Sequence, residues 1–193
     1  MNATARATRS PATAAMADRQ QPVAGASPPG WPLGLVRIAI GLLWFQQLLW
    51  KPPPDFGCGP SGNQGLCDWM QREIDHPLLP AYATFVRDLV LPNLGVLGWM
   101  VFLMEAAIAV SLLLGVLVRL GGLLGFGQAT NLLIGLAAVP GEWYWTYVML
   151  ALFCLLFALT GAGRWLGLDR SLLPRLRAST GRAGLTGKLV YAL

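Results

Sequence analysis

Charged residues are scarce in this chain. Asp, Glu, Lys and Arg together make up 12% of its 193 residues, whereas 55% of the residues are hydrophobic. A soluble domain usually carries about 25% charged residues, so the composition is that of an integral membrane protein. The length fits one domain.

Histidine is nearly absent as well. His76 is the only one, which excludes bis-His haem ligation within the chain. The sequence also lacks the ligand spacing of a zinc site, a phosphate-binding glycine loop and a nucleophile paired with a base. We therefore expect no haem or metal, and no nucleic-acid partner. Any electrons would have to be carried by a quinone or by a partner subunit.

Large apolar side chains are almost missing from residues 1–30, which are rich in Ala, Thr, Pro and Arg. Such a segment cannot bury enough surface to fold, so a disordered, cytoplasmic N-terminal tail is predicted. It holds no apolar stretch of roughly 7–15 residues, so we expect no secretory signal peptide. Its three arginines and single acid leave an organelle-transit interpretation open.

Four long hydrophobic segments follow, at about residues 33–50, 93–118, 120–139 and 143–160. At a rise of about 1.5 Å per residue, 18 helical residues reach about 27 Å, just enough for the hydrocarbon core of a bilayer. The second and third segments are joined by almost nothing, so they should form an antiparallel pair. The sequence predicts an all-α, integral membrane four-helix bundle over residues 31–169.

Basic residues are distributed unevenly over the predicted loops. One side of the membrane would hold 11 of the 14 Lys and Arg residues, and the other side only Lys51, Arg72 and Arg87. The positive-inside rule then places both termini in the cytoplasm and predicts a multi-pass protein of the cytoplasmic membrane. The basic segment 170–193 is interpreted either as a solvated cytoplasmic tail or as a tail lying on anionic lipid.

The predicted outer loop, residues 51–92, is too long for a plain connection. Apolar residues recur in it at helical spacing, which predicts two short amphipathic helices. Their apolar faces are Leu66, Trp69, Met70 and Ile74 in the first, and Tyr82, Phe85, Val86, Leu89 and Val90 in the second. Cys58 and Cys67 lie on the predicted oxidising side, where they form either a disulfide that staples the loop or two free thiols.

Polar residues inside the predicted spans are the clue to function. Glu105 lies in the second span, Gln46 and Gln47 in the first, and Gln128 and Asn131 in the third. Counting about 1.5 Å per residue from the cytoplasmic ends puts Gln46 and Glu105 roughly 20 Å deep and Asn131 about 16 Å deep. If their faces converge, they form one polar cluster slightly outside the middle of the membrane.

This predicted cluster has two interpretations. In the first it binds a quinone head group, with Glu105 exchanging protons and the amides of Gln46, Gln47, Gln128 and Asn131 bonding the carbonyl oxygens. A carboxyl group inside a membrane costs roughly 2.5–3.5 kcal/mol on insertion scales and by default hints at function. In the second, the same side chains only join the helices, at about 0.6 kcal/mol per hydrogen bond.

Three stretches together resemble the DoxX/DoxD family of small four-helix membrane proteins. The resemblance covers about residues 33–173, and the long loop with its Pro-Pro-Asp-Phe run is similar to the DoxD-type branch. The residues that carry it are Arg37 and Gly41 with Lys51 in the first stretch, Glu105, Gly115 and Arg119 in the second, and Gly163, Arg164 and Asp169 within GAGRWLGLDRSL in the third.

The DoxD-type branch is the small subunit of thiosulfate:quinone oxidoreductase. The resemblance implies a membrane subunit beside a partner redox subunit, with thiosulfate oxidised to tetrathionate on the outer side while quinone is reduced. The alternative is a non-catalytic accessory or assembly protein for a redox or oxidative-stress complex. A dianion needs clustered donors, and the predicted outer loop offers only Lys51, Arg72, Arg87 and helix N-termini.

Overall fold

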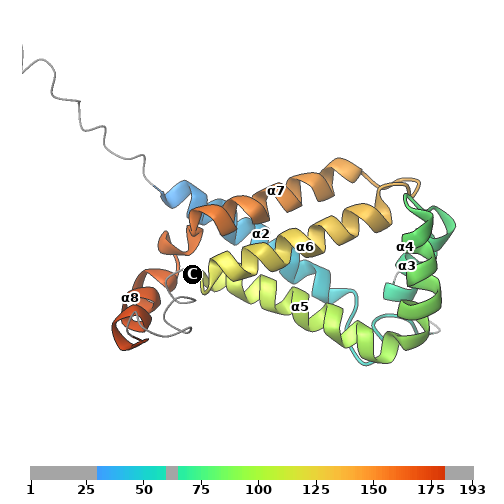
Figure 1. Ribbon diagram of the computed structural model, residues 1–193, viewed down its shortest axis with the longest axis horizontal. Helices are drawn as coiled ribbons and strands as arrows, with labels where there is room; N and C mark the ends of the chain where they lie inside the picture. Colours follow the sequence, from blue (N-terminus) through green and yellow to red (C-terminus); the bar gives the residue numbers. More distant parts are fainter. Residues whose placement is uncertain (1–29, 60–64, 181–193) are drawn as a thin grey trace, which may run out of the picture.

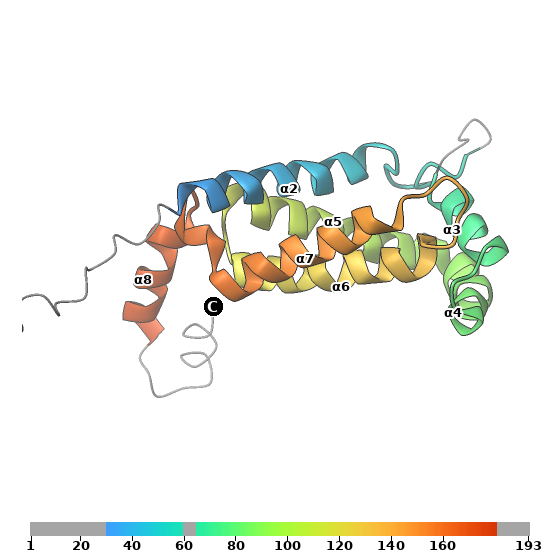
Figure 2. The same cartoon turned by 90° about the horizontal axis from the view of Figure 1, so that it is seen from above.

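The computed structural model of the protein describes residues 30–59 and 65–180, of which residues 176–180 are described by their backbone alone. Every regular element in these ranges is a helix. Four long helices lie side by side as an elongated bundle (Figure 1 and Figure 2): α2 (Trp31–Leu49), α5 (Leu94–Leu114), α6 (Val118–Leu136) and α7 (Tyr144–Thr160). The prediction of an all-α fold is confirmed. Of the predicted tails 1–30 and 170–193, residues 1–29 and 181–193 lie outside the described residues. The first part of the second tail forms a helix in the structure, Asp169–Thr180.

The bundle has two different ends. At one, which we call the loop end, lie α3 (Leu66–Asp75) and α4 (Pro80–Phe85), and at the other, the tail end, lies α8 (Asp169–Thr180) (Figure 1). Helix α2 begins at the tail end, and α7 returns there before α8 (Figure 2). The four long helices therefore run in alternating directions, and both ends of the described chain lie at the tail end.

The sequence pattern predicted that the second amphipathic stretch of the loop is a separate short helix. In the structure it is not. It begins a continuous helical run of 35 residues from Pro80 to Leu114. The chain passes from α4 into α5 through a π-helical turn, Val86–Val90, and a 3₁₀ turn, Leu91–Asn93. Pro92 lacks the N–H that an α-helix needs at this point, and the change of helix type accommodates it without ending the run.

Helix α5 ends at residue 114 rather than at the predicted 118. Gly115 takes a left-handed φ of +67° and closes the helix with a hydrogen bond from its N–H to the carbonyl of Ser111. Glycine suits this position because it has no Cβ to clash. Leu117 is also left-handed, and α6 begins at Val118, so a turn of only three residues joins α5 and α6 as antiparallel neighbours.

Small residues let the helices of the bundle approach each other closely. Helix α6 packs most extensively on α7. A Cβ on Gly122 would lie 2.7 Å from the carbonyl oxygen of Cys154 and 2.8 Å from the backbone nitrogen of Ala158. The buried side chains of Trp44 and Ile108 fill the core next to this contact. Close approach through small residues is common where helices pack in membranes.

A second apolar cluster covers the loop end. Phe56 is buried there, with its ring edge-on to Trp99 at 5.9 Å between the ring centroids. It packs with Leu66 and Met70 of α3 and with Val86 of the helical run after α4. Beside it, a disulfide joins Cys58 to Cys67. These contacts hold α3 and the start of the long helical run against the bundle.

Two segments of the described chain are long and apolar enough to cross a membrane, Trp31–Leu49 and Pro80–Leu114, and α7 is a shorter apolar helix. In each of the two segments only 28% of the most apolar window is buried. Large apolar side chains point outward from the other helices too, among them Leu152 and Leu159. Extended apolar surfaces of this kind mark contact with lipid or with another protein.

The close contact between α6 and α7 can be tested with two glycines of the same helix. Gly122→Ala should destabilise the bundle by roughly 1–3 kcal/mol, because the new methyl group presses on backbone atoms of α7. Gly127→Ala is the control, since nothing lies within 4 Å of its new methyl group and alanine is the better helix former. Thermal unfolding in detergent compares the variants, and equal melting temperatures would contradict this packing.

Candidate functional site

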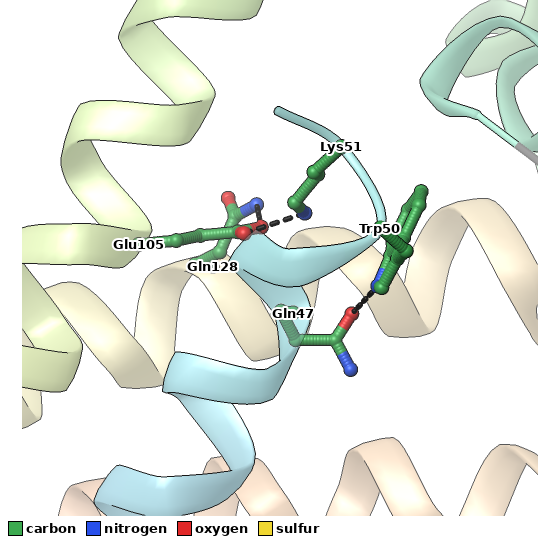
Figure 3. Close-up of polar contacts among 5 residues, drawn as sticks. All are labelled: Gln47, Trp50, Lys51, Glu105 and Gln128. Atoms are coloured by element: carbon green, nitrogen blue, oxygen red, sulfur yellow. Dashed lines mark hydrogen bonds and ion pairs between the residues drawn. The ribbon is translucent and has the colours of Figure 1, made fainter. Parts of the chain in front are cut away.

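A buried ion pair lies inside the bundle. Lys51 Nζ is 2.5 Å from Glu105 Oε2, and Gln128 Nε2 donates a 3.1 Å hydrogen bond to the other carboxylate oxygen. Figure 3 shows Lys51 reaching Glu105 from the end of α2, while Gln128 approaches from α6. Glu105 is fully buried, and Lys51 and Gln128 are only 2% and 5% exposed. Three parts of the chain thus contribute one polar group each to a single site.

Burial makes this ion pair energetically demanding. Taking two charges out of water costs several kcal/mol per ion, and their attraction offsets that cost only if the remaining polar atoms are bonded as well. Here Gln128 satisfies the second carboxylate oxygen, and the Lys51 ammonium lies 4.7 Å from the centre of the Trp50 ring. Glu105 lies in a segment that is long and apolar enough to cross a membrane, and ionisable groups in such segments tend to be functional, so the pair marks the candidate site.

Lys51 was not predicted as the partner of Glu105, because the sequence pattern placed it in the outer loop. The signal was nevertheless present in α2, whose buried residues recur every three or four positions up to Trp44. The same spacing continues to Gln47 and Lys51. Both residues therefore lie on the face of the chain that is turned into the bundle.

Gln46 does not join this site, in contrast to the predicted cluster. Its side chain is exposed, because it lies about 200° around the helix from the buried Trp44. The depth count placed Gln46 level with Glu105 but did not consider the face on which it lies. Gln47 instead accepts a 3.2 Å hydrogen bond from Trp50 Nε1, close to the ion pair (Figure 3).

A cavity of about 1350 Å³ lies beside the ion pair. Gln47, Lys51, Glu105 and Gln128 contribute polar groups to its wall. Most of the remaining wall is apolar and aromatic, and it includes Trp44, Trp50, Trp69, Phe85, Trp145 and Phe153. A concave, mostly apolar site with a few convergent polar groups is the usual form of a small-molecule binding site.

A second polar cluster lines the same cavity. Tyr82 donates its hydroxyl hydrogen to Asn131 Oδ1 at 3.1 Å. Glu73 is 8% exposed and lies against α6, where a Cβ on Gly135 would be 2.6 Å from its carboxyl carbon. Burial raises the pKa of Glu73 to about 7, and the nearby hydroxyl group of Tyr82 limits that rise. Asn131, predicted to share a site with Glu105, thus bonds Tyr82.

Glu73 and Tyr82 were not predicted as site residues, because both belong to the amphipathic stretches of the loop. Helix α3 buries Leu66, Met70 and Glu73 on one face. A carboxyl group that interrupts an otherwise apolar face is the sequence signal that could have identified Glu73.

The residues that carry the family resemblance gather mainly at the tail end, and Arg37 is central there. It is fully buried, and its guanidinium donates hydrogen bonds to the carbonyl oxygens of Leu112 and, at 2.9 Å, Leu166. Gly115 leaves room for this group, since a Cβ there would lie 2.9 Å from Arg37 Nη1. Arg37 therefore ties α2 to the end of α5 and to the segment that follows α7.

Asp169 holds the same end of the bundle together. Its carboxylate accepts hydrogen bonds from the backbone N–H groups of Leu117 at 2.8 Å and Val118 at 3.1 Å, at the start of α6. A carboxylate is favourable there because the first N–H groups of a helix lack partners within it. Gly163 packs directly on this carboxylate, which a Cβ would overlap.

Arg119 and Arg164 both lie close to a nearby glycine, Gly161. Their Nε atoms are 3.2 Å and 3.7 Å from the position that a Cβ on that glycine would take. We call this group of residues the tail-end framework: Arg37, Gly115, Arg119, Gly163, Arg164 and Asp169. It contains most of the residues that carry the resemblance, and none of its six residues lines the cavity.

No protein-family model, curated protein or solved structure matches the chain. The site is therefore interpreted from its own geometry. Within the part of the chain that the structure describes, no group of three or more His, Cys, Asp or Glu side chains is arranged to hold a metal ion.

Removing either partner of the buried ion pair should destabilise the protein, because the other charge then stays buried without its counter-ion. We expect Glu105→Leu and Lys51→Met each to lower the free energy of unfolding by roughly 3–5 kcal/mol. The double variant should recover most of this loss. Unfolding of the four proteins in one detergent completes a double-mutant cycle that isolates the coupling energy.

The exposed ion pair between Arg72 and Asp68, with 3.0 Å between Nη2 and Oδ2, provides the matched control. The same kind of cycle with Arg72→Met and Asp68→Leu should show a coupling below about 1 kcal/mol. Strictly additive losses for Lys51 and Glu105 would mean that the two side chains do not interact in the folded protein.

Proposed function

We propose that this chain is a four-span protein of the cytoplasmic membrane, of the DoxX/DoxD kind, with both termini in the cytoplasm. Two segments, Trp31–Leu49 and Pro80–Leu114, are long and apolar enough to cross a membrane. The four crossings are inferred because α6 and α7 lie beside these helices in the bundle and also carry outward apolar side chains. The tail end then faces the cytoplasm and the loop end faces outward, in line with the basic residues near the tail end. The convergence of the resemblance residues into one framework supports the family assignment.

The function that the site supports best is quinone binding within a redox complex. The observation that carries this proposal is a large, aromatic-lined cavity that reaches a buried Lys51–Glu105 pair. A quinone is a flat apolar ring with carbonyl oxygens that accept hydrogen bonds. Apolar walls with a few fixed donors match that chemistry.

The donors that such a ring needs are present and oriented. The side-chain oxygen of Gln47 already accepts a hydrogen bond from Trp50. The NH₂ group of Gln47, which lines the cavity, is therefore left as a donor. Lys51 carries three N–H bonds and Gln128 two, more than their contacts with Glu105 use. Glu105 would exchange a proton with a bound oxygen, as a general acid or base within hydrogen-bond reach.

Reduction of a quinone to a quinol takes up two electrons and two protons. With thiosulfate as the donor, two thiosulfate ions form one tetrathionate ion and release the two electrons. The three cations on the outer side are each already paired with an acid: Lys51 with Glu105, Arg72 with Asp68 and Arg87 with Asp88. We therefore assign thiosulfate binding to a partner redox subunit and quinone binding to this chain.

The second candidate function is a non-catalytic accessory or assembly protein. The observation that favours it is the tail-end framework, in which Arg37 and Asp169 hold helix ends instead of lining the cavity. Affinity purification of the tagged protein in mild detergent should then yield a redox partner whose activity is unchanged by Glu105→Gln. A partner that loses quinone reduction with Glu105→Gln supports the quinone-binding function.

Quinone binding can be measured directly in lipid nanodiscs. Trp44, Trp50, Trp69 and Trp145 line the cavity, so a soluble quinone such as a decyl-ubiquinone should quench tryptophan fluorescence saturably. Gln47→Leu removes the donor amide, and we expect its Kd to rise by about threefold to tenfold, equivalent to one hydrogen bond of about 0.5–1.5 kcal/mol.

Gln46→Leu is the matched control, since it changes the same residue type one position away on the exposed face of α2. Its Kd should equal that of the wild type. The absence of saturable quenching in the wild type, or an equal effect of both substitutions, would refute quinone binding in this cavity.

A further inference from the structure

Glu73 is a buried acid that takes no part in the ion pair between Lys51 and Glu105. It belongs to α3, is 8% exposed and lines the cavity. The ion pairs among the described residues involve Glu105, Asp68 and Asp88, so Glu73 is buried without a cation. Its carboxyl group lies directly against α6 at Gly135, and a side chain at that glycine would displace it. A charge in such a place is costly, which favours a carboxyl that changes its protonation state.

The hydrogen bonds of Tyr82 are coupled to that protonation state. A phenol has one hydrogen to donate. In the structure Tyr82 donates it to Asn131 at 3.1 Å, and its hydroxyl group lies close enough to Glu73 to lower the pKa of that carboxyl group. An ionised Glu73 therefore competes with Asn131 for the hydrogen of Tyr82.

One face of α6 connects this cluster with the buried ion pair. Gln128, Asn131 and Gly135 are spaced by three and four residues, so they follow one another along the same side of the helix. Gln128 forms a hydrogen bond with Glu105, and Asn131 forms one with Tyr82. The carboxyl group of Glu73 packs against Gly135. Polar groups therefore extend along the cavity from the ion pair to α3 at the loop end, where Figure 1 places that helix.

Few other ionisable groups face Glu73. Tyr82 approaches from α4, and Tyr147 of α7 is close enough to feel its charge. Tyr147 is itself hydrogen-bonded to Glu142 at 2.5 Å. All of these groups are neutral or acidic, so none of them stabilises the ionised form of Glu73 as a cation would. With a pKa of about 7, Glu73 is half protonated near neutral pH and can both take up and release a proton.

We propose that Glu73 and Tyr82 form a proton-exchange site at the loop end of the cavity, which takes protons from the outer side for the reduction of bound quinone. This inference rests on the proposed quinone-binding function. Each quinone that accepts two electrons from the thiosulfate-oxidising partner must also accept two protons, and Glu73 supplies protons to the cavity and is reprotonated from the loop end. Tyr82 and Asn131 are positioning residues that hold the carboxyl group at the cavity wall.

The first experiment observes the carboxyl group itself, without quinone. Infrared difference spectra of the protein in nanodiscs, recorded over a pH titration, should show a protonated carboxyl band that disappears with a midpoint near the Glu73 pKa of about 7. Glu73→Gln should remove this band, and Tyr82→Phe should move its midpoint to higher pH, because the nearby hydroxyl group of Tyr82 favours the ionised form. A midpoint at the ordinary pKa of about 4.3 would overturn the proposal.

The second experiment follows proton supply to quinone. Protein loaded with decyl-ubiquinone is mixed rapidly with dithionite as a two-electron donor, and loss of quinone absorbance is recorded. At saturating quinone, Glu73→Gln should slow reduction about tenfold or more and abolish its pH dependence around neutral pH. Asp75→Asn, an exposed acid on the same helix, is the matched control and should behave like the wild type.

The outcomes separate this proposal from the one on which it rests. If the wild type binds no quinone, the quinone-binding function is refuted and proton supply with it. If the wild type binds quinone, and quinone bound to Glu73→Gln is reduced at the same rate and with the same pH profile as in the wild type, only the proton-exchange site is refuted.

Discussion

The buried ion pair between Lys51 and Glu105 is the constraint on which the rest of the structure depends. A pair of charges without water is tolerated only if its geometry is held and its remaining atoms are bonded. The chain meets this requirement by bringing together the end of α2, the middle of α5 and Gln128 of α6. The tail-end framework around Arg37 and Asp169 fixes these helices relative to one another at the opposite end. The cavity forms beside the pair, where the bundle is covered by the loop helices rather than closed by its own side chains.

The all-α fold and the positions of the long helices were predictable from the sequence, because hydrophobic runs punctuated by proline and glycine are a strong local signal. Individual boundaries were less predictable. The predicted loop ended at residue 92 and the predicted span began at residue 93, yet a π turn and a 3₁₀ turn carry one helical run across this boundary. Gly115 ends α5 four residues before the predicted boundary, since the close approach of Arg37 favours a glycine there. Such outcomes depend on tertiary contacts that a local pattern does not contain.

Only part of the candidate site was predictable from the sequence. Glu105 was identified because a carboxyl group in an apolar helix stands out, and Gln128, one of the amides predicted to share its site, bonds it. Gln46 did not join it, because one residue along a helix turns a side chain by about 100°. Asn131 lies on the same side of α6 as Gln128 but about one turn further along, where it bonds Tyr82 instead. The partner Lys51 was overlooked because a lysine at the end of a span is normally interpreted as a surface group that reaches water. Glu73 interrupts the apolar face of α3 and could have been singled out from the sequence. That it lines the cavity together with Tyr82 depends on how α3 and α4 pack on the bundle.

The central claim of this account is that the cavity beside Lys51 and Glu105 binds quinone. Photolabelling with an azido-quinone in nanodiscs, followed by peptide mapping with mass spectrometry, tests it most directly. The account predicts labels on cavity residues of α2 and α6, in the segments around Gln47 and Gln128, and loss of these labels when unmodified quinone is added in excess. Labels confined to outward-facing residues such as Leu42 and Leu152, unaffected by competing quinone, would contradict it.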